Sequence, residues 1–163
     1  MQDVYATVAS NTSLKIFLTL VAILDLECNQ YDIITAFLNA SIADGVNIYV
    51  RQLEGFEDGT SRVCRLRRAL YGLRRSPLWW YQTVTQVLVE LGFQPLASEL
   101  CLFKNEQTSA LLLLYVDDFC IAAPTQDDIQ KAYSLLKDHF DVKELGLVRQ
   151  FLGFTIIRNR PQH

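Results

Sequence analysis

Two adjacent carboxylates interrupt one of the most apolar stretches of the chain. Residues 111–116 read LLLLYV, Asp117 and Asp118 follow, and apolar sequence resumes at once over residues 119–123. This pattern predicts a strand, a tight acidic turn and a second strand deep in a sheet. Turn statistics also allow an ordinary solvated Asp-Asp hairpin, although such a turn would more naturally have polar neighbours.

A third carboxylate, Asp32, ends another predicted strand over residues 27–34, and it precedes Asp117 by 85 residues. Partly buried carboxylates that lie close together are destabilised unless they are protonated or bind a cation. Mg²⁺ prefers such hard oxygen ligands, and a pair of metal ions held by carboxylates supports nucleotidyl transfer. From the residues alone, Asp32 is better explained as a strand-end residue or cap.

The remaining elements alternate between helices and strands. Residues 14–24 are expected to form a buried helix capped within residues 11–13, and Gly92 and Gly146 are expected to interrupt regular structure. The other helices are predicted to begin at Ser76-Pro77 and after Thr125. Further strands are predicted over residues 46–50, 63–66, 100–104, 110–116 and 151–157. The order predicts an α+β layer of helices on an antiparallel sheet.

Charge and cysteine content give weaker indications. The net charge of −3 disfavours a nucleic-acid partner, whereas a cluster of arginines favours one or forms a solvated face. That cluster comprises Arg62, Arg65, Arg67, Arg68, Arg74 and Arg75. The four cysteines form no C-x-x-C pair, so we expect buried reduced thiols, no zinc site and an intracellular protein. The apolar run 14–24 is too short to span a membrane, so no membrane partner is expected.

Six segments, in order, resemble the reverse transcriptases of copia-type long-terminal-repeat retrotransposons over nearly the whole chain. They are YATVA (5–9), YDIITAFLN (31–39), EGFED (54–58), ALYGLRRSP with WY (69–77, 80–81), YVDD (115–118) and FLG (151–153). The resemblance implies a polymerase palm, a ferredoxin-like antiparallel sheet with helices on one face, plus a remnant of fingers. Residues 1–163 would form a single partial reverse transcriptase domain of a retrotransposon polyprotein, an RNA-directed DNA polymerase core.

The same resemblance implies roles for individual residues. Asp32, Asp117, Asp118 and the Ile33 carbonyl would hold two Mg²⁺ or Mn²⁺ ions, and Phe37 would exclude a 2′-hydroxyl through an open ring face beside the acids. The other nucleotide-binding residues would be Ala36, Tyr71, Gly72 and Arg74. The nucleic-acid-binding residues would be Arg75, Ser76, Pro77, Tyr115, Phe151, Leu152 and Gly153.

The expected partners are an RNA or DNA template, a DNA or tRNA primer and a dNTP. The fingers segment that holds the triphosphate, the thumb and the RNase H domain are expected to lie outside these 163 residues, so the isolated chain should extend a primer poorly or not at all. Arg75, Ala40 and Glu99 depart from the family pattern of Gln, Gly and Asp. An inactive remnant that binds nucleic acid or protein, or an unrelated ferredoxin-like RNA-binding module, are the alternatives.

Overall fold

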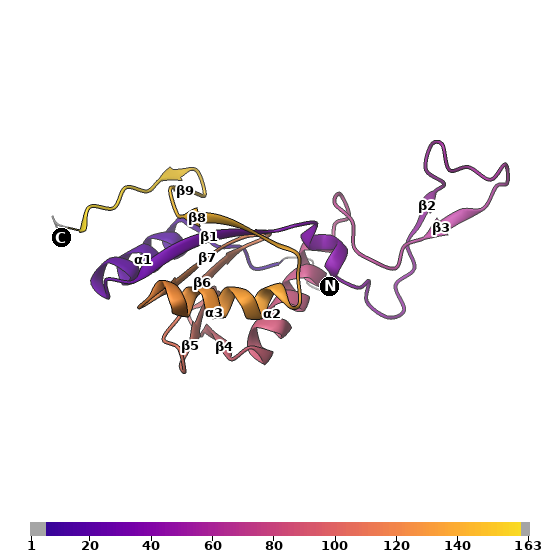
Figure 1. Ribbon diagram of the computed structural model, residues 1–163. Coiled ribbons are helices and arrows are strands. Elements are labelled where there is room, and N and C mark those ends of the chain that lie inside the picture. The colour runs from indigo at the N-terminus through magenta and orange to yellow at the C-terminus, as the bar shows by residue number, and fades with distance from the viewer. Residues whose placement is uncertain (1–5, 161–163) are drawn as a thin grey trace.

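The computed structural model describes residues 6–160, over which the chain forms a six-stranded antiparallel sheet. The strand order is β4-β5-β6-β7-β1-β8 (Figure 1). The strands are β1 (Glu27–Ile33), β4 (Phe93–Leu96), β5 (Glu99–Asn105), β6 (Leu111–Tyr115), β7 (Asp118–Ala123) and β8 (Val142–Leu147). The predicted α+β class with an antiparallel sheet is therefore confirmed.

Helices cover both faces of this sheet, so the expectation of helices on one face is wrong. Helix α1 (Asn11–Ile23) packs on one face, and α2 (Ser76–Glu90) and α3 (Gln126–Lys137) pack on the other (Figure 1). Strand β6 shows why, because Leu112 and Leu114 join the α2–α3 core while Leu111 and Leu113 join the α1 core. A strand that is apolar on both faces needs a cover on each.

The three helices differ in the hydrogen bonds that fix their first turns. Ser10, rather than residues 11–13, caps α1 through a reciprocal capping box with Ser13. Thr125 caps α3 as predicted, accepting a bond from the Asp128 amide. Ser76 does not cap α2: it is the first helical residue, and its hydroxyl donates to the Leu70 carbonyl at 2.6 Å, which fixes the preceding turn.

The segment between β1 and α2 leaves the main sheet. A 3-10 turn, η1 (Ala36–Asn39), is followed by a separate two-stranded hairpin of β2 (Tyr49–Arg51) and β3 (Val63–Arg65). This β2–β3 hairpin projects away from the sheet (Figure 1). A strand was predicted over residues 46–50, and the structure has it shorter and outside the core because little packs against it.

The prediction missed β4 and β8. Gly146 does not break the chain; it lies in β8 with φ +79, next to a β-bulge opposite Gln30 and Tyr31. Instead of one strand over residues 151–157, the structure has a small hairpin of β9 (Gln150–Phe151) and β10 (Phe154–Thr155). The bulge in the β1–β8 pairing interrupts the alternation of apolar and polar residues by which a strand is recognised in sequence, and this explains why β8 was missed.

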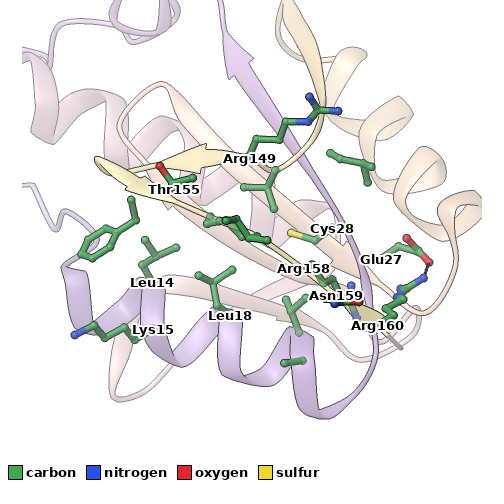
Figure 2. A pocket seen from close by; sticks show the side chains of 17 residues that line it. Leu14, Lys15, Leu18, Glu27, Cys28, Arg149, Thr155, Arg158, Asn159 and Arg160 are labelled. Carbon is green, nitrogen blue, oxygen red and sulfur yellow. Dashed lines mark hydrogen bonds and ion pairs between the residues drawn. The ribbon is translucent and has the colours of Figure 1, made fainter. Parts of the chain in front are cut away.

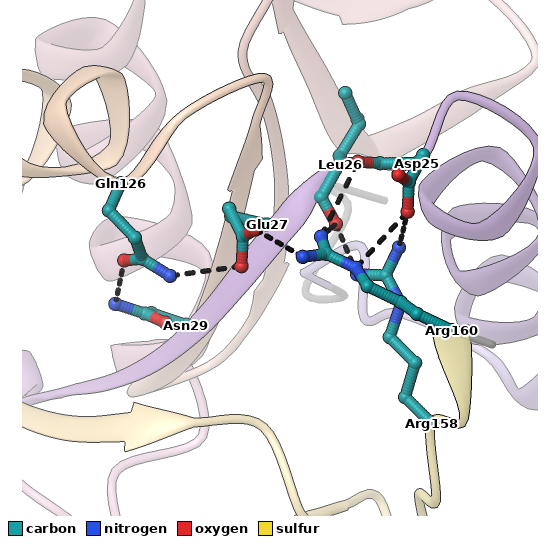
Figure 3. A network of polar contacts seen from close by, with 7 residues as sticks. All are labelled: Asp25, Leu26, Glu27, Asn29, Gln126, Arg158 and Arg160. Atoms are coloured by element: carbon teal, nitrogen blue, oxygen red, sulfur yellow. Dashed lines mark hydrogen bonds and ion pairs between the residues drawn. The ribbon is translucent and has the colours of Figure 1, made fainter.

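The C-terminal segment crosses beside α1 and is held by ion pairs. Arg158 and Arg160 both pair with Asp25, and Arg160 also pairs with Glu27 (Figure 3). Beneath this segment lies a largely apolar groove of about 910 Å³, lined by α1 residues such as Leu14 and Leu18 (Figure 2). The groove includes none of the three predicted metal-binding aspartates.

The cysteines and the lengths of the helices bear on two further expectations. Cys28, Cys101 and Cys120 are buried, but Cys64 is exposed on β3, contrary to the expectation of four buried thiols. Within residues 6–160, no helix has both the length and the apolar content needed to cross a bilayer.

Candidate functional site

The three predicted acids meet at one end of the central sheet. Strands β1 and β7 are antiparallel neighbours, and their register places Asp32 directly opposite Asp118. The Ile33 amide donates to the Asp117 carbonyl at 2.8 Å, which joins the end of β1 to the β6–β7 turn. Side chains alternate along strands, so Asp32 and Asp118 lie on the sheet face of Cys28 and Cys120, the face that α1 covers farther along.

The acidic turn has a strained backbone. Its two loop residues are Val116 and Asp117, and Val116 has φ +53, a region that β-branched residues rarely adopt. Such a conformation costs on the order of 1–3 kcal/mol and persists only where surrounding structure enforces it. Trp80 supplies one such restraint, because its indole nitrogen donates to the Val116 carbonyl at 2.7 Å. Sequence gave no signal for this contact.

The electrostatics of the site disfavour its charged state. Burial raises the pKa of the Asp118 carboxyl, the charges of Asp32 and Asp117 raise it further, and a hydrogen bond with Gln30 opposes them. Gln30 could have been identified from sequence, since it lies two residues before Asp32 and so on the same face. None of the ion pairs formed within residues 6–160 includes any of the three aspartates.

Tyr71 occupies part of the site. Its hydroxyl donates to Asp117 Oδ2 at 2.8 Å, and 56% of the residue is exposed. Burial of the hydroxyl, the bond to Asp117 and the charges of Asp117 and Asp32 raise the pKa of Tyr71 to about 12. Tyr71 therefore stays protonated at neutral pH and remains a donor to the carboxylate.

Phe37 does not present an open ring face, so this part of the expectation is wrong. It is 8% exposed and lies in the core with α2 and α3. Its ring centroid is 4.4 Å from that of Tyr71, which covers it. The residue exposed beside the acids is Tyr71, and Phe37 lies beneath it.

The remaining predicted residues divide into a buried and an accessible set. Ala36, Ser76 and Phe151 are buried, so their side chains support the site from within. Leu152 and Gly153, in the β9–β10 turn, line a hollow of about 640 Å³ together with Tyr115 and Asp118. The accessible or half-buried remainder consists of Gly72, Arg74, Arg75 and Pro77.

Three of the segments that resemble copia-type reverse transcriptases come together next to the acidic turn. Ala6, Thr7 and Val8 line a small hollow with Pro77 and Val116, so three segments far apart in the sequence lie together there. Tyr5, which belongs to the first of these segments, lies outside the described residues.

The acidic site offers oxygen donors to a metal ion, but they are not preassembled around one position. No group of three or more His, Cys, Asp or Glu side chains among residues 6–160 is arranged as a ready cluster of metal ligands. The Tyr71 hydroxyl already engages one Asp117 oxygen. The donor chemistry suits Mg²⁺ or Mn²⁺, since it consists of carboxylate oxygens whose mutual repulsion a cation would relieve. Binding would require Tyr71 to release Asp117 or to share it.

Comparison with known proteins gives a family match over almost the whole chain. The family model described as reverse transcriptase (RNA-dependent DNA polymerase) matches residues 1–161.

Three relatives agree with this match. The retrovirus-related Pol polyprotein from transposon TNT 1-94 of Nicotiana tabacum is 37% identical over 97% of this chain, and that from transposon RE1 of Arabidopsis thaliana is 30% identical over 96%. The chain spans only 12% and 11% of these two proteins. The putative transposon Ty5-1 protein of Saccharomyces cerevisiae is 33% identical over 77% of this chain, which covers 41% of that protein.

Proposed function

Because the chain belongs to the reverse transcriptase family of copia-type retrotransposon Pol polyproteins, we propose that it forms the catalytic core of an RNA-directed DNA polymerase. It would join a dNTP to a primer 3′-hydroxyl on an RNA or DNA template. Asp32, Asp117 and Asp118 would hold two Mg²⁺ or Mn²⁺ ions, with the Ile33 carbonyl as a further ligand.

One observation carries this proposal: the in-register pairing of Asp32 with Asp118, reinforced by the bond from Ile33 to Asp117. Backbone pairing brings together two acids that lie 86 residues apart in sequence, and none of the described ion pairs supplies them with a balancing cation. When bound, divalent ions would lower the pKa of the attacking hydroxyl and stabilise the leaving pyrophosphate.

The protein's own residues would position the substrates. The hollow between Asp118, Tyr115 and the β9–β10 turn lies where a primer end would reach the acids. Tyr71, whose ring covers Phe37, would contact the sugar of the incoming nucleotide. This exposed aromatic ring next to the acids would discriminate against a 2′-hydroxyl by steric exclusion.

Primer extension tests the proposal. The chain would be joined to the segments that flank it in a longer Pol polyprotein, and incorporation would be measured on a primed RNA template. Asp117→Asn should reduce incorporation by about a hundred- to a thousandfold, the scale on which loss of an essential electrostatic group acts. Asp127→Asn, at an exposed position in the first turn of α3, is the matched control and should leave incorporation unchanged.

A second candidate, an inactive remnant, makes a different prediction for the same experiment. It predicts no incorporation by the joined wild-type polypeptide, although the fold is intact by circular dichroism. Incorporation that survives Asp117→Asn would show instead that the metal site has been assigned to the wrong residues.

A further inference from the structure

Residues 46–75 carry a concentration of positive charge, most of which lies between the β2–β3 hairpin and α2, because residues 49–65 of the hairpin itself contain three arginines and three acidic residues. Residues 46–75 contain seven arginines and three acidic residues, a net charge of +4. The rest of the chain has eight basic and fifteen acidic residues, a net charge of −7. The acidic balance of the whole chain therefore conceals one strongly basic segment.

The register of the hairpin sorts these residues onto one face. Tyr49 pairs with Arg65, and Arg51 pairs with Val63. Residues two apart on a strand share a face, so one side of the ribbon presents two arginines, a tyrosine and a valine. All four are exposed, Tyr49 to 58%. We call Tyr49, Arg51 and Arg65 the hairpin strip.

Arg51 and Arg65 form no ion pair with a carboxylate of residues 6–160. Among the ion pairs within residues 6–160, the hairpin contributes only that of Arg62 with Asp58, at its tip. Asp58 accepts bonds from Thr60, Gln52 and Arg62, and these, led by the Thr60 hydroxyl, lower its pKa to about 2. The tip is thus an internally bonded loop, whereas Arg51 and Arg65 have no such carboxylate partner in the described chain.

A series of backbone hydrogen bonds connects the β2–β3 hairpin to η1, next to the acidic site. Below β2 and β3, the Leu66 amide donates to the Ile48 carbonyl, and the pairing continues through a bridge between Ser41 and Arg68. The Ala69 amide then donates to the Ala40 carbonyl at 2.9 Å, directly beside η1, which carries Phe37. A strand of nucleic acid that leaves the acidic site along this ladder would pass onto the hairpin strip.

We propose that the hairpin strip of Tyr49, Arg51 and Arg65 binds single-stranded nucleic acid, namely the unpaired template that leads into the acidic site. This inference rests on the proposed function for the identity of the strand. Guanidinium groups bind phosphate through forked hydrogen bonds, and an exposed aromatic ring offers a stacking surface for a base. The combination of arginines with an aromatic residue favours a single strand over a duplex, whose bases are already stacked.

Fluorescence anisotropy with a labelled 12-nucleotide single-stranded RNA tests the proposal, using the whole chain in EDTA at several KCl concentrations. Each phosphate contact in a single strand contributes about 0.7 to the salt slope of the logarithm of the affinity. Arg51→Gln with Arg65→Gln should therefore weaken binding by about tenfold or more and reduce the slope by about 1.4. Tyr49→Ala should weaken binding about tenfold with little change in slope, since stacking is not ionic.

Two controls separate this inference from the proposed function. Arg62→Gln removes a hairpin arginine that is already paired with Asp58, and it should leave binding unchanged. The second control is the absence of metal ions: binding is measured in EDTA, so its outcome is independent of the metal-dependent incorporation that Asp117→Asn tests. The inference is overturned if wild-type chain does not bind the RNA, if Arg62→Gln is as damaging as the double variant, or if a 12-base-pair duplex competes as well as the single strand.

Discussion

The acidic end of the central sheet and the β2–β3 hairpin differ in how they hold their functional side chains. Asp32 and Asp118 come from the paired strands β1 and β7, and the β6–β7 turn that carries Asp117 is bonded to Ile33 and to buried Trp80. The hairpin strip lies on a two-stranded ribbon outside the main sheet with its side chains exposed. Metal ligands need a fixed geometry, whereas contacts to a flexible polyanion tolerate mobile side chains.

The energetic consequence is a difference in local stability. Elements with many buried contacts open only with global unfolding, and exposed ribbons open more easily. We therefore expect substitutions at the acidic end to change the free energy of unfolding, and substitutions in the hairpin to change binding alone.

Trp80→Ala should destabilise the protein by about 3–5 kcal/mol, because it removes a large buried side chain and a donor to the acidic turn. Phe56→Ala is the contrasting substitution: Phe56 lies in the hairpin loop, 82% exposed, and its loss should change stability by less than about 0.5 kcal/mol. Urea unfolding followed by circular dichroism measures both. Similar effects for the two variants would remove the contrast between the regions.

Asp118→Asn should stabilise the metal-free protein at neutral pH by on the order of 1 kcal/mol, the scale of repulsion between like charges about 4 Å apart that water screens. Burial and the neighbouring aspartates raise the pKa of Asp118 in the fold above its ordinary 3.8. The protonated form is therefore favoured by folding, and the stability that it contributes is present below pH 3.8 and is lost as the pH rises through the folded pKa.

The variant lacks this titration, so its advantage over wild type should be close to zero near pH 3 and should grow toward neutral pH. Thermal or urea unfolding at a series of pH values measures the difference. An advantage that is independent of pH would mean that packing, rather than charge, explains it. Adding Mg²⁺ should narrow the gap by stabilising wild type.

Local periodicity and a strong residue pattern predicted the acidic turn and the two strands around it, whereas the approach of Asp32 was predicted from the resemblance to a known family. It could not predict contacts set by tertiary packing, namely the Trp80 bond to Val116 and the cover of Tyr71 over Phe37. The two-sided placement of helices was missed because the one-sided arrangement came from the resemblance, although the fully apolar run at 111–114 already indicated two buried faces.

Tyr71→Phe should raise the affinity for Mn²⁺ by about two- to tenfold, because Tyr71 is largely exposed and its bond should contribute about 0.5–1.5 kcal/mol, the range of a typical intramolecular hydrogen bond. The variant keeps the ring over Phe37 and removes only the donor to Asp117. Mn²⁺ binding by electron paramagnetic resonance measures the change. Tyr81→Phe is the matched control, since its hydroxyl donates to the Leu100 carbonyl away from the acids. Weaker Mn²⁺ binding by Tyr71→Phe would mean that the hydroxyl positions Asp117 for the metal.

The reactivity of the four thiols measures how easily the central sheet and the hairpin open, without a substitution that changes stability. Thiol reagents react with the thiolate, so exposure and a low pKa favour reaction. Burial raises the pKa of Cys101 to about 12 and that of Cys120 well above its ordinary value, while Cys64 is exposed on the hairpin. One thiol per chain should therefore react rapidly with Ellman's reagent in the native protein, and the other three should react at the rate of unfolding. Cys64→Ser should abolish the rapid phase and leave the urea midpoint unchanged. Rapid reaction of a second thiol would show that the central sheet opens as readily as the hairpin, and the division between a rigid acidic end and an adaptable strip would not hold.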